Sequence, residues 1–176
     1  AIVSVNHGLT DAFAHPAVAG VAWDATVSPN QTDLSLVGGV DSKISDSMTQ
    51  QPGVAAISSI GRFVTEVGDL GVPVYTVFDR PSGSTVHLVT LSGRAPASDD
   101  EIEFGPSTAH DLGLEIGDSV KLADGATARV VGLGLFPTDV HAQFDEGAWV
   151  TPGRWSRLTQ QSTGAIPIHS STWCWR

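Results

Sequence analysis

The chain has 176 residues, a formal net charge of −10 and a sequence pI near 4.7. Nine basic residues stand against nineteen acidic ones, which argues against nucleic acid or an anionic membrane surface as the main partner. The single cysteine, Cys174, excludes an internal disulfide, and the length allows one or two domains with a proper core.

The first part of the chain predicts two helices and one strand. An apolar stripe from Ile2 to Phe13 indicates an amphipathic helix. Val21–Val27 is a strand that carries Trp23, and Asp41–Gln50 is a second helix that ends before Pro52-Gly53.

Three strands are expected next. Val54–Val67, with a possible break at Gly61, pairs with Val72–Phe78 through the turn Gly68–Gly71, and Val86–Leu91 follows. A helix followed by antiparallel strands is typical of the α+β class.

The segment Ser92–Pro137 carries the densest set of local signals. Glu101–Phe104 is a short strand, with Ile102 and Phe104 on one face and Glu101 and Glu103 on the other. Ser107 is expected to cap a helix that runs through Leu112 and ends at Gly113. Asp124-Gly125 predicts a type I′ hairpin turn with positive φ at both residues, before the strand Thr127–Phe136.

The last part of the chain predicts a strand and a helix. Ala148–Thr151 is the strand, and Pro152 opens a helix through Leu158. Ile166–Arg176 is either a final strand or an exposed tail.

No familiar catalytic or cofactor motif is present. The chain lacks a Walker A loop, a Gly-x-Gly-x-x-Gly fingerprint and a Gly-x-Ser-x-Gly elbow. The six histidines show no metal-ligand spacing, although a fold can still bring His110 and His141 together; they are His7, His15, His87, His110, His141 and His169. We therefore expect no catalytic residue, no cofactor and no metal.

The charged and aromatic candidates have structural interpretations. Asp99-Asp100-Glu101 lacks the ligand pattern of a calcium loop and is best explained as a solvated turn entering a strand. Arg94 is expected to form an ion pair with Asp99 or Asp100, and the functional alternative is contact with a partner. The tryptophans are expected to be core or interface anchors; they are Trp23, Trp149 and Trp155.

An ordered set of motifs resembles the extracytoplasmic domain of FtsX/MacB-type ABC transporter permeases, particularly actinobacterial members. The pattern is Gly-Arg-x-Pro, an acidic cluster, Leu-Gly-Leu, Gly-Asp-x-Val and Val-x-Gly. The residues that carry it, together with the Trp-Asp pair near the start, are Trp23, Asp24, Gly93, Arg94, Pro96, Glu101, Leu112, Gly113, Gly117, Asp118, Val120 and Gly132.

This resemblance implies an α+β fold like the MacB periplasmic core. Residues 1–91 with 148–176 would form a helix-and-sheet, porter-like part, and residues 92–147 a smaller β-rich part. It further implies a non-enzymatic domain outside the plasma membrane, anchored by the permease's own membrane helices, which lie outside this chain. A cytoplasmic ATPase subunit, a second permease copy or an accessory protein would be its partners, and motion would be coupled to the handling of a cargo.

Two other classes remain open. Leu114–Leu122 resembles one hairpin of a double-psi barrel used for substrate recognition. A secreted hydrolase or sugar-binding protein would need two carboxylates brought together by the fold, drawn from Asp24, Glu66 or Glu103.

Overall fold

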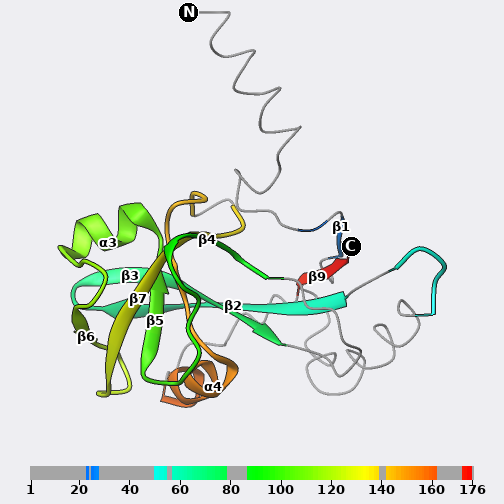
Figure 1. Ribbon diagram of the computed structural model, residues 1–176. Helices are drawn as coiled ribbons and strands as arrows, with labels where there is room; N and C mark the ends of the chain where they lie inside the picture. Colours follow the sequence, from blue (N-terminus) through cyan, green and yellow to red (C-terminus); the bar gives the residue numbers. More distant parts are fainter. Residues whose placement is uncertain are drawn as a thin grey trace, which may run out of the picture.

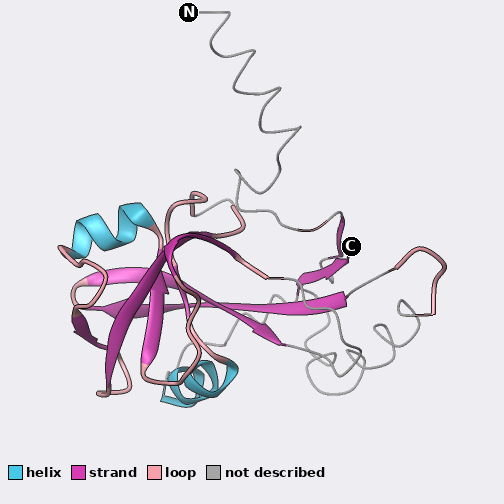
Figure 2. Cartoon of the chain, in the orientation of Figure 1, coloured by secondary structure: helices cyan, strands magenta, loops and turns pink. Residues whose placement is uncertain are grey.

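The structure is a computed structural model that describes residues 23, 25–27, 50–54, 57–78, 87–138, 142–161 and 172–175. Its strands are β1 (Ala25–Val27), β2 (Ile57–Val67), β3 (Leu70–Phe78), β4 (Val89–Gly93), β5 (Glu101–Phe104), β6 (Ser119–Lys121), β7 (Thr127–Leu135), β8 (Ala148–Trp149) and β9 (Thr172–Trp175). The two described helices are α3 (Pro106–Leu112) and α4 (Pro152–Gln161). The fold is therefore α+β, and the sheet dominates it (Figures 1 and 2).

The described strands form one mixed sheet in the order β1-β9-β2-β3-β8-β5-β7-β4, with β6 paired to β7. The pairs β3–β8 and β5–β7 are parallel, and the others are antiparallel. β8 therefore joins the β2–β3 hairpin to the strands of the Ser92–Pro137 segment.

The β2–β3 hairpin is the longest regular element. Side chains of β2 alternate between buried Phe63, Thr65 and Val67 and exposed neighbours, as a strand with one covered face requires. The predicted break at Gly61 does not occur, because Gly61 pairs with Thr76 within a continuous ladder. The turn is also tighter than predicted, since Val67 already pairs with Leu70.

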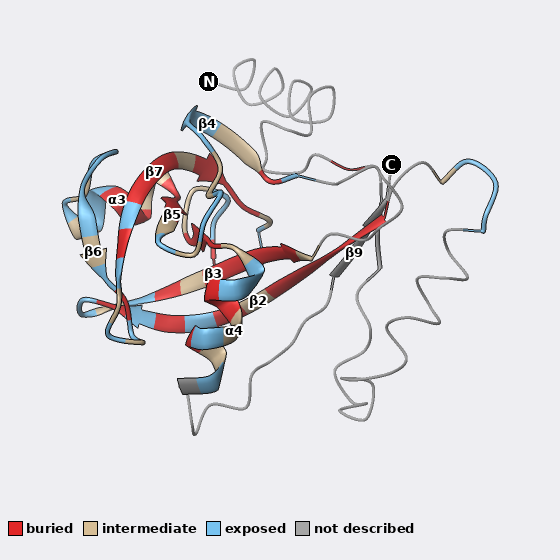
Figure 3. Ribbon diagram, turned by 60° about the horizontal axis from the view of Figure 1, so that its bottom comes forward, coloured by how far each residue is buried: buried red, intermediate tan, exposed pale blue. Residues whose placement is uncertain are grey.

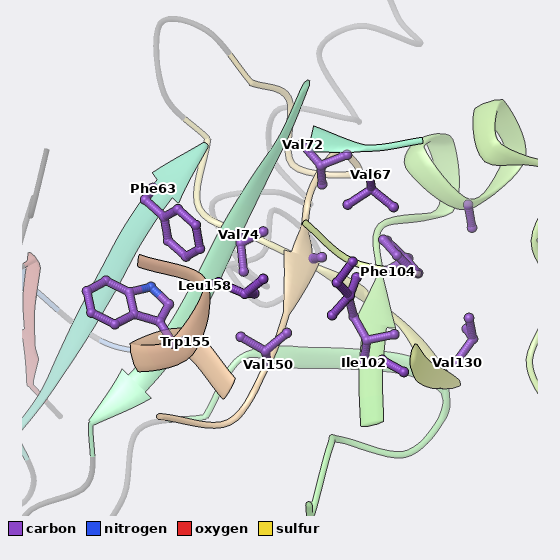
Figure 4. Packing of buried hydrophobic residues seen from close by; sticks show 14 residues of the cluster. Phe63, Val67, Val72, Val74, Ile102, Phe104, Val130, Val150, Trp155 and Leu158 are labelled. Carbon is purple, nitrogen blue, oxygen red and sulfur yellow. The ribbon is translucent and has the colours of Figure 1, made fainter. Parts of the chain in front are cut away.

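One face of the sheet packs against α4 and forms the main core. Figure 4 shows Trp155 and Leu158 of α4 lying against Phe63 and Val74. The rings of Trp155 and Phe63 meet edge-on at 5.5 Å. A burial view shows buried residues along β2, β3 and β7 (Figure 3). The expected anchoring role of the tryptophans is confirmed for Trp23, Trp149 and Trp155, which are all buried.

Two local predictions in the Ser92–Pro137 segment are wrong. Gly105, not Ser107, is the N-cap of α3, because Pro106 occupies the first helical position and Ser107 donates to Asp145 Oδ2 at 2.6 Å. Gly113 ends the helix at φ +65°, as predicted.

The β6–β7 turn is not type I′. Gly125 has φ +76°, but no non-glycine residue in the described chain has positive φ, so Asp124 does not. Gly125 N–H donates to Leu122 O, and Leu122 N–H donates to Ala126 O. This is a three-residue loop with glycine in the left-handed position, which needs only one positive φ.

The remaining predictions divide into tested and untested ones. The strand predicted at Val86–Leu91 is observed as β4, which begins later, at Val89. The prediction of a helix from Pro152 is confirmed by α4. The final segment contains the strand β9. The predicted helices Ile2–Phe13 and Asp41–Gln50 lie outside the described residues, apart from Gln50 in a turn.

Candidate functional site

The motif residues at the start of β5 form a braced ion pair. Arg94 Nη1 donates to Glu101 Oε2 at 2.7 Å, Arg94 Nη2 contacts Oε1, and the Ala97 N–H also donates to Oε2. The hydrogen bond from Arg94, followed by that from Ala97, lowers the pKa of Glu101 to about 2. The expected pairing of Arg94 with Asp99 or Asp100 is therefore wrong, since Asp99 turns instead toward α4.

The glycines of the motif allow close backbone approach. Gly93 has φ +72° and pairs with Gly132 across β4 and β7. A Cβ added at Gly93 would overlap Val131 O, and one added at Gly132 would overlap Arg94 O. Only glycine fits both positions without moving a strand.

The other motif residues also have local structural roles. Asp118 Oδ2 accepts the Glu115 N–H at 2.9 Å, and Gly117 has φ +108°. Leu112 and Val120 pack against the main core, and Pro96 is half-buried. Asp24 lies outside the described residues. The described members between Gly93 and Gly132 thus have structural roles within the Ser92–Pro137 unit.

A buried arginine on α4 forms a second charged network. Arg154 Nη1 lies 2.6 Å from Asp124 Oδ2, and both side chains are about 95% buried. Arg154 Nε donates to the Asp99 carbonyl oxygen, while Arg157 pairs with the Asp99 carboxylate at 2.7 Å. The hydrogen bond from Thr151, with a further contribution from Arg157, lowers the pKa of Asp99. The network joins α4 to the turn before β5 and to the β6–β7 hairpin.

The face of the sheet opposite α4 carries a row of paired residues. Arg62 pairs with Tyr75, Tyr75 with Trp149, Trp149 with Glu103, and Glu103 with Gly132. Directly paired residues point to the same face of a sheet. The guanidinium of Arg62 lies 6.0 Å from the Tyr75 ring centroid. The row thus begins with a cation, continues with two aromatic residues, and ends with an acid that is paired with a glycine.

Glu103 is the unusual member of this row. It is 0% exposed, Thr90 Oγ1 donates to its Oε2 at 3.2 Å, and its Oε1 has no hydrogen-bond partner among the described residues. Burial raises the pKa of Glu103 to about 7, and the hydrogen bond from Thr90 lowers it in part. An acid with these properties can take up or release a proton near neutral pH.

The sequence identified Glu103 only as one of three acids available to a hydrolase. Glu66, the second, is exposed on β2 near the hairpin end, and Asp24 lies outside the described residues. The signal for a buried Glu103 was the pair of glycines, Gly132 and Gly134, in an otherwise apolar strand.

The described residues form neither a metal cluster nor a helix able to cross a membrane. Among the described residues, no group of three or more His, Cys, Asp and Glu side chains is placed to hold a metal. His87 and His110 are exposed, and the other four histidines lie outside the described ranges. No described helix is long and apolar enough to cross a membrane.

Comparisons with known proteins returned structural neighbours only. No family model and no curated protein matches the chain. One similar structure is a domain of a protein described as a permease from Porphyromonas gingivalis, at 12% identity and TM-score 0.46, covering 74% of this chain and 65% of that one. Another is the periplasmic region of MacB from Actinobacillus actinomycetemcomitans, at 14% identity and TM-score 0.44, covering 85% and 72%.

This chain spans 65% of the length of the Porphyromonas gingivalis domain.

Proposed function

We propose that this chain is the extracytoplasmic domain of an ABC transporter permease subunit, with a MacB-like periplasmic core fold and no enzymatic activity of its own. The observation that carries the proposal is the ordered motif set. Its members from Gly93 to Gly132 occupy one continuous unit, β4 through β7, and have specific structural roles: the Arg94–Glu101 ion pair, the Gly93–Gly132 contact and the Gly113 helix end. A chance collection of common motifs would not be expected to fit together in this way.

The path of the chain through the sheet supports the same proposal. Ala25, the first residue of β1, is paired with Trp175, the last residue of β9. The chain therefore enters and leaves these strands at the same place. The Ser92–Pro137 unit forms the other end of the strand order, and Figure 1 shows α3 and β6 far from β1 and β9. A domain inserted between two membrane helices has to return both of its ends to one side.

In this proposal the two parts have different tasks. Residues 1–91 with 148–176 form the porter-like part nearer the membrane, and residues 92–147 project away from it. A cytoplasmic ATPase moves the permease helices, and those helices move the domain through β1 and β9. The sheet passes this motion to the outer part, which handles cargo with a second permease copy or an accessory protein.

Location can be tested by labelling cells that produce the full permease. Lys121→Cys, in a Cys174→Ser background, places a thiol at an exposed position of β6. A membrane-impermeant maleimide should label it equally in intact and in lysed cells. Ala128→Cys, buried on β7, is the matched control and should label in neither. Labelling of Lys121→Cys only after lysis would contradict an extracytoplasmic location.

Absence of nucleotide binding can be tested on the chain itself. Because no phosphate-binding loop occurs in the sequence, titration calorimetry with ATP and Mg²⁺ should show no binding. Micromolar affinity for ATP would show that the chain belongs to the motor and not to the permease.

A further inference from the structure

The carboxyl of Glu103 reaches across a neighbouring strand. Glu103 lies on β5, and its hydrogen-bond donor, Thr90, lies on β4. Between them runs β7, which has Gly134 at the crossing point. A Cβ at Gly134 would overlap Glu103 Oε1 and would lie 2.7 Å from Val89 O. The carboxyl thus fills the space that a side chain on β7 would occupy, and it links β5 directly to the end strand β4.

The backbone ladders on both sides of β7 are interrupted close to Glu103 and Thr90. The β5–β7 register shifts between Ile102 and Glu103, and the β4–β7 register shifts between Thr90 and Ser92. Bulges of this kind remove ladder hydrogen bonds and are concentrated at sheet edges and functional sites. The side-chain bond between Glu103 and Thr90 therefore adds an attachment for β4 where its backbone ladder is interrupted.

No described cation neutralises Glu103. β4 and β8 carry no charged side chain, and burial, not a neighbouring charge, causes the raised pKa. Other ionisable groups on or near the packed elements are Glu101 with Arg94, Arg129 on the exposed side of β7, His87 before β4, and Tyr75 and Arg62 beyond Trp149.

We propose that Glu103 is a proton-operated latch that controls the attachment of β4 to the sheet. With a proton bound, the neutral acid is compatible with burial, and Thr90 holds β4 in place. Loss of the proton leaves a buried carboxylate with one hydrogen bond and no cation, which is unfavourable. Local separation of β4 relieves this by admitting water. Because β4 leads directly into Arg94, its release also changes how the Arg94–Glu101 pair is held.

The latch can be tested on the full chain by amide hydrogen exchange from pH 5.5 to 8.5, corrected at each pH for the intrinsic rate. Protection of the β4 amides, Val89–Gly93, should fall about tenfold or more with a midpoint near pH 7. Protection of the β2–β3 hairpin should stay constant. In Glu103→Gln, β4 protection should no longer depend on pH. Glu66→Gln, which changes an exposed acid on β2, is the matched control and should behave as wild type.

Thr90→Val removes the hydrogen bond to Glu103 but leaves the Glu103 carboxyl able to titrate, so the two effects can be measured apart. Since the Thr90 bond lowers the pKa of Glu103, its loss should weaken β4 at low pH and move the midpoint upward. Carbon NMR of the Glu103 carboxyl in wild type gives an independent readout should Glu103→Gln fail to fold. Titration at its ordinary value of 4.5, or titration near 7 without any change in β4 protection, would each overturn the latch.

Discussion

Two buried ionisable side chains in this domain, Arg154 and Glu103, have opposite environments. Arg154 on α4 has Asp124 at 2.6 Å and the Asp99 carbonyl as a further acceptor. In the part of the chain that the structure describes, Glu103 on β5 has one hydroxyl donor and one carboxylate oxygen with no partner. A charge that is fully paired can remain ionised when buried, whereas a lone acid is shifted toward its neutral form. The first arrangement serves structure, and the second is the one suited to respond to pH.

The largest expected effect is at the paired site. Arg154→Met leaves Asp124 buried without its cation and should lower the free energy of unfolding by about 3–5 kcal/mol. Arg157→Met is the matched control, because Arg157 is half-exposed and pairs with a partly exposed carboxylate. It should cost at most about 1 kcal/mol. Urea denaturation of both variants measures the difference, and equal losses would mean that burial does not decide the value of these ion pairs.

A smaller effect is expected where β7 makes room for Glu103. Gly134→Ala inserts a methyl group against Oε1 and Val89 O and should destabilise the chain by about 1–3 kcal/mol. Gly71→Ala on β3 meets only Val64 at 3.8 Å and should be nearly neutral. Adding Glu103→Ala should recover part of the Gly134→Ala loss. A double-mutant cycle with no coupling would place the carboxyl elsewhere.

The hairpin that carries Asp124 gives the third effect. Gly125→Val forces a β-branched residue to φ near +76° and should cost about 1–2 kcal/mol. Ala123 is an exposed residue of the same loop and has no positive φ. Ala123→Val should therefore leave the urea midpoint unchanged. Identical midpoints for the two variants would show that the loop does not need a left-handed residue.

Local signals predicted local structure well. Glu101–Phe104 has the predicted bounds, Gly113 ends its helix, and Pro152 opens α4. In each case a few neighbouring residues decide the conformation, through alternation, positive φ or a missing N–H.

The ion-pair partners and the burial of charged residues could not be predicted from neighbouring residues in the sequence. Arg94 had three acids within reach along the chain. Asp99 turns toward α4 and Asp100 accepts from Ser98, so Glu101 is its partner. The burial of Glu103 depends on β7, β8 and β4, which are brought together by long-range pairing and by two bulges. Gly132 and Gly134 indicate close packing or a bulge in β7, but no short-range pattern shows which side chain lies against them.

The pH dependence of stability tests the contrast between the two sites most directly. Glu103 has a pKa of about 7 in the folded chain and an ordinary value of 4.5, so between these values the folded chain binds more protons than the unfolded chain. Stability from Glu103 is therefore complete below about pH 4.5 and falls by on the order of 3 kcal/mol as pH rises through 7. Glu101 and Asp99 have lowered pKa values, so their contributions change only at lower pH.

The measurement is the free energy of unfolding in urea at pH 5 to 8.5 for wild type and Glu103→Gln. The wild type should lose stability as pH rises across this range, and Glu103→Gln should not, so that the variant becomes the more stable protein at pH 8.5. Parallel curves for the two proteins would contradict the assignment of Glu103 as a lone buried acid that titrates near neutral pH.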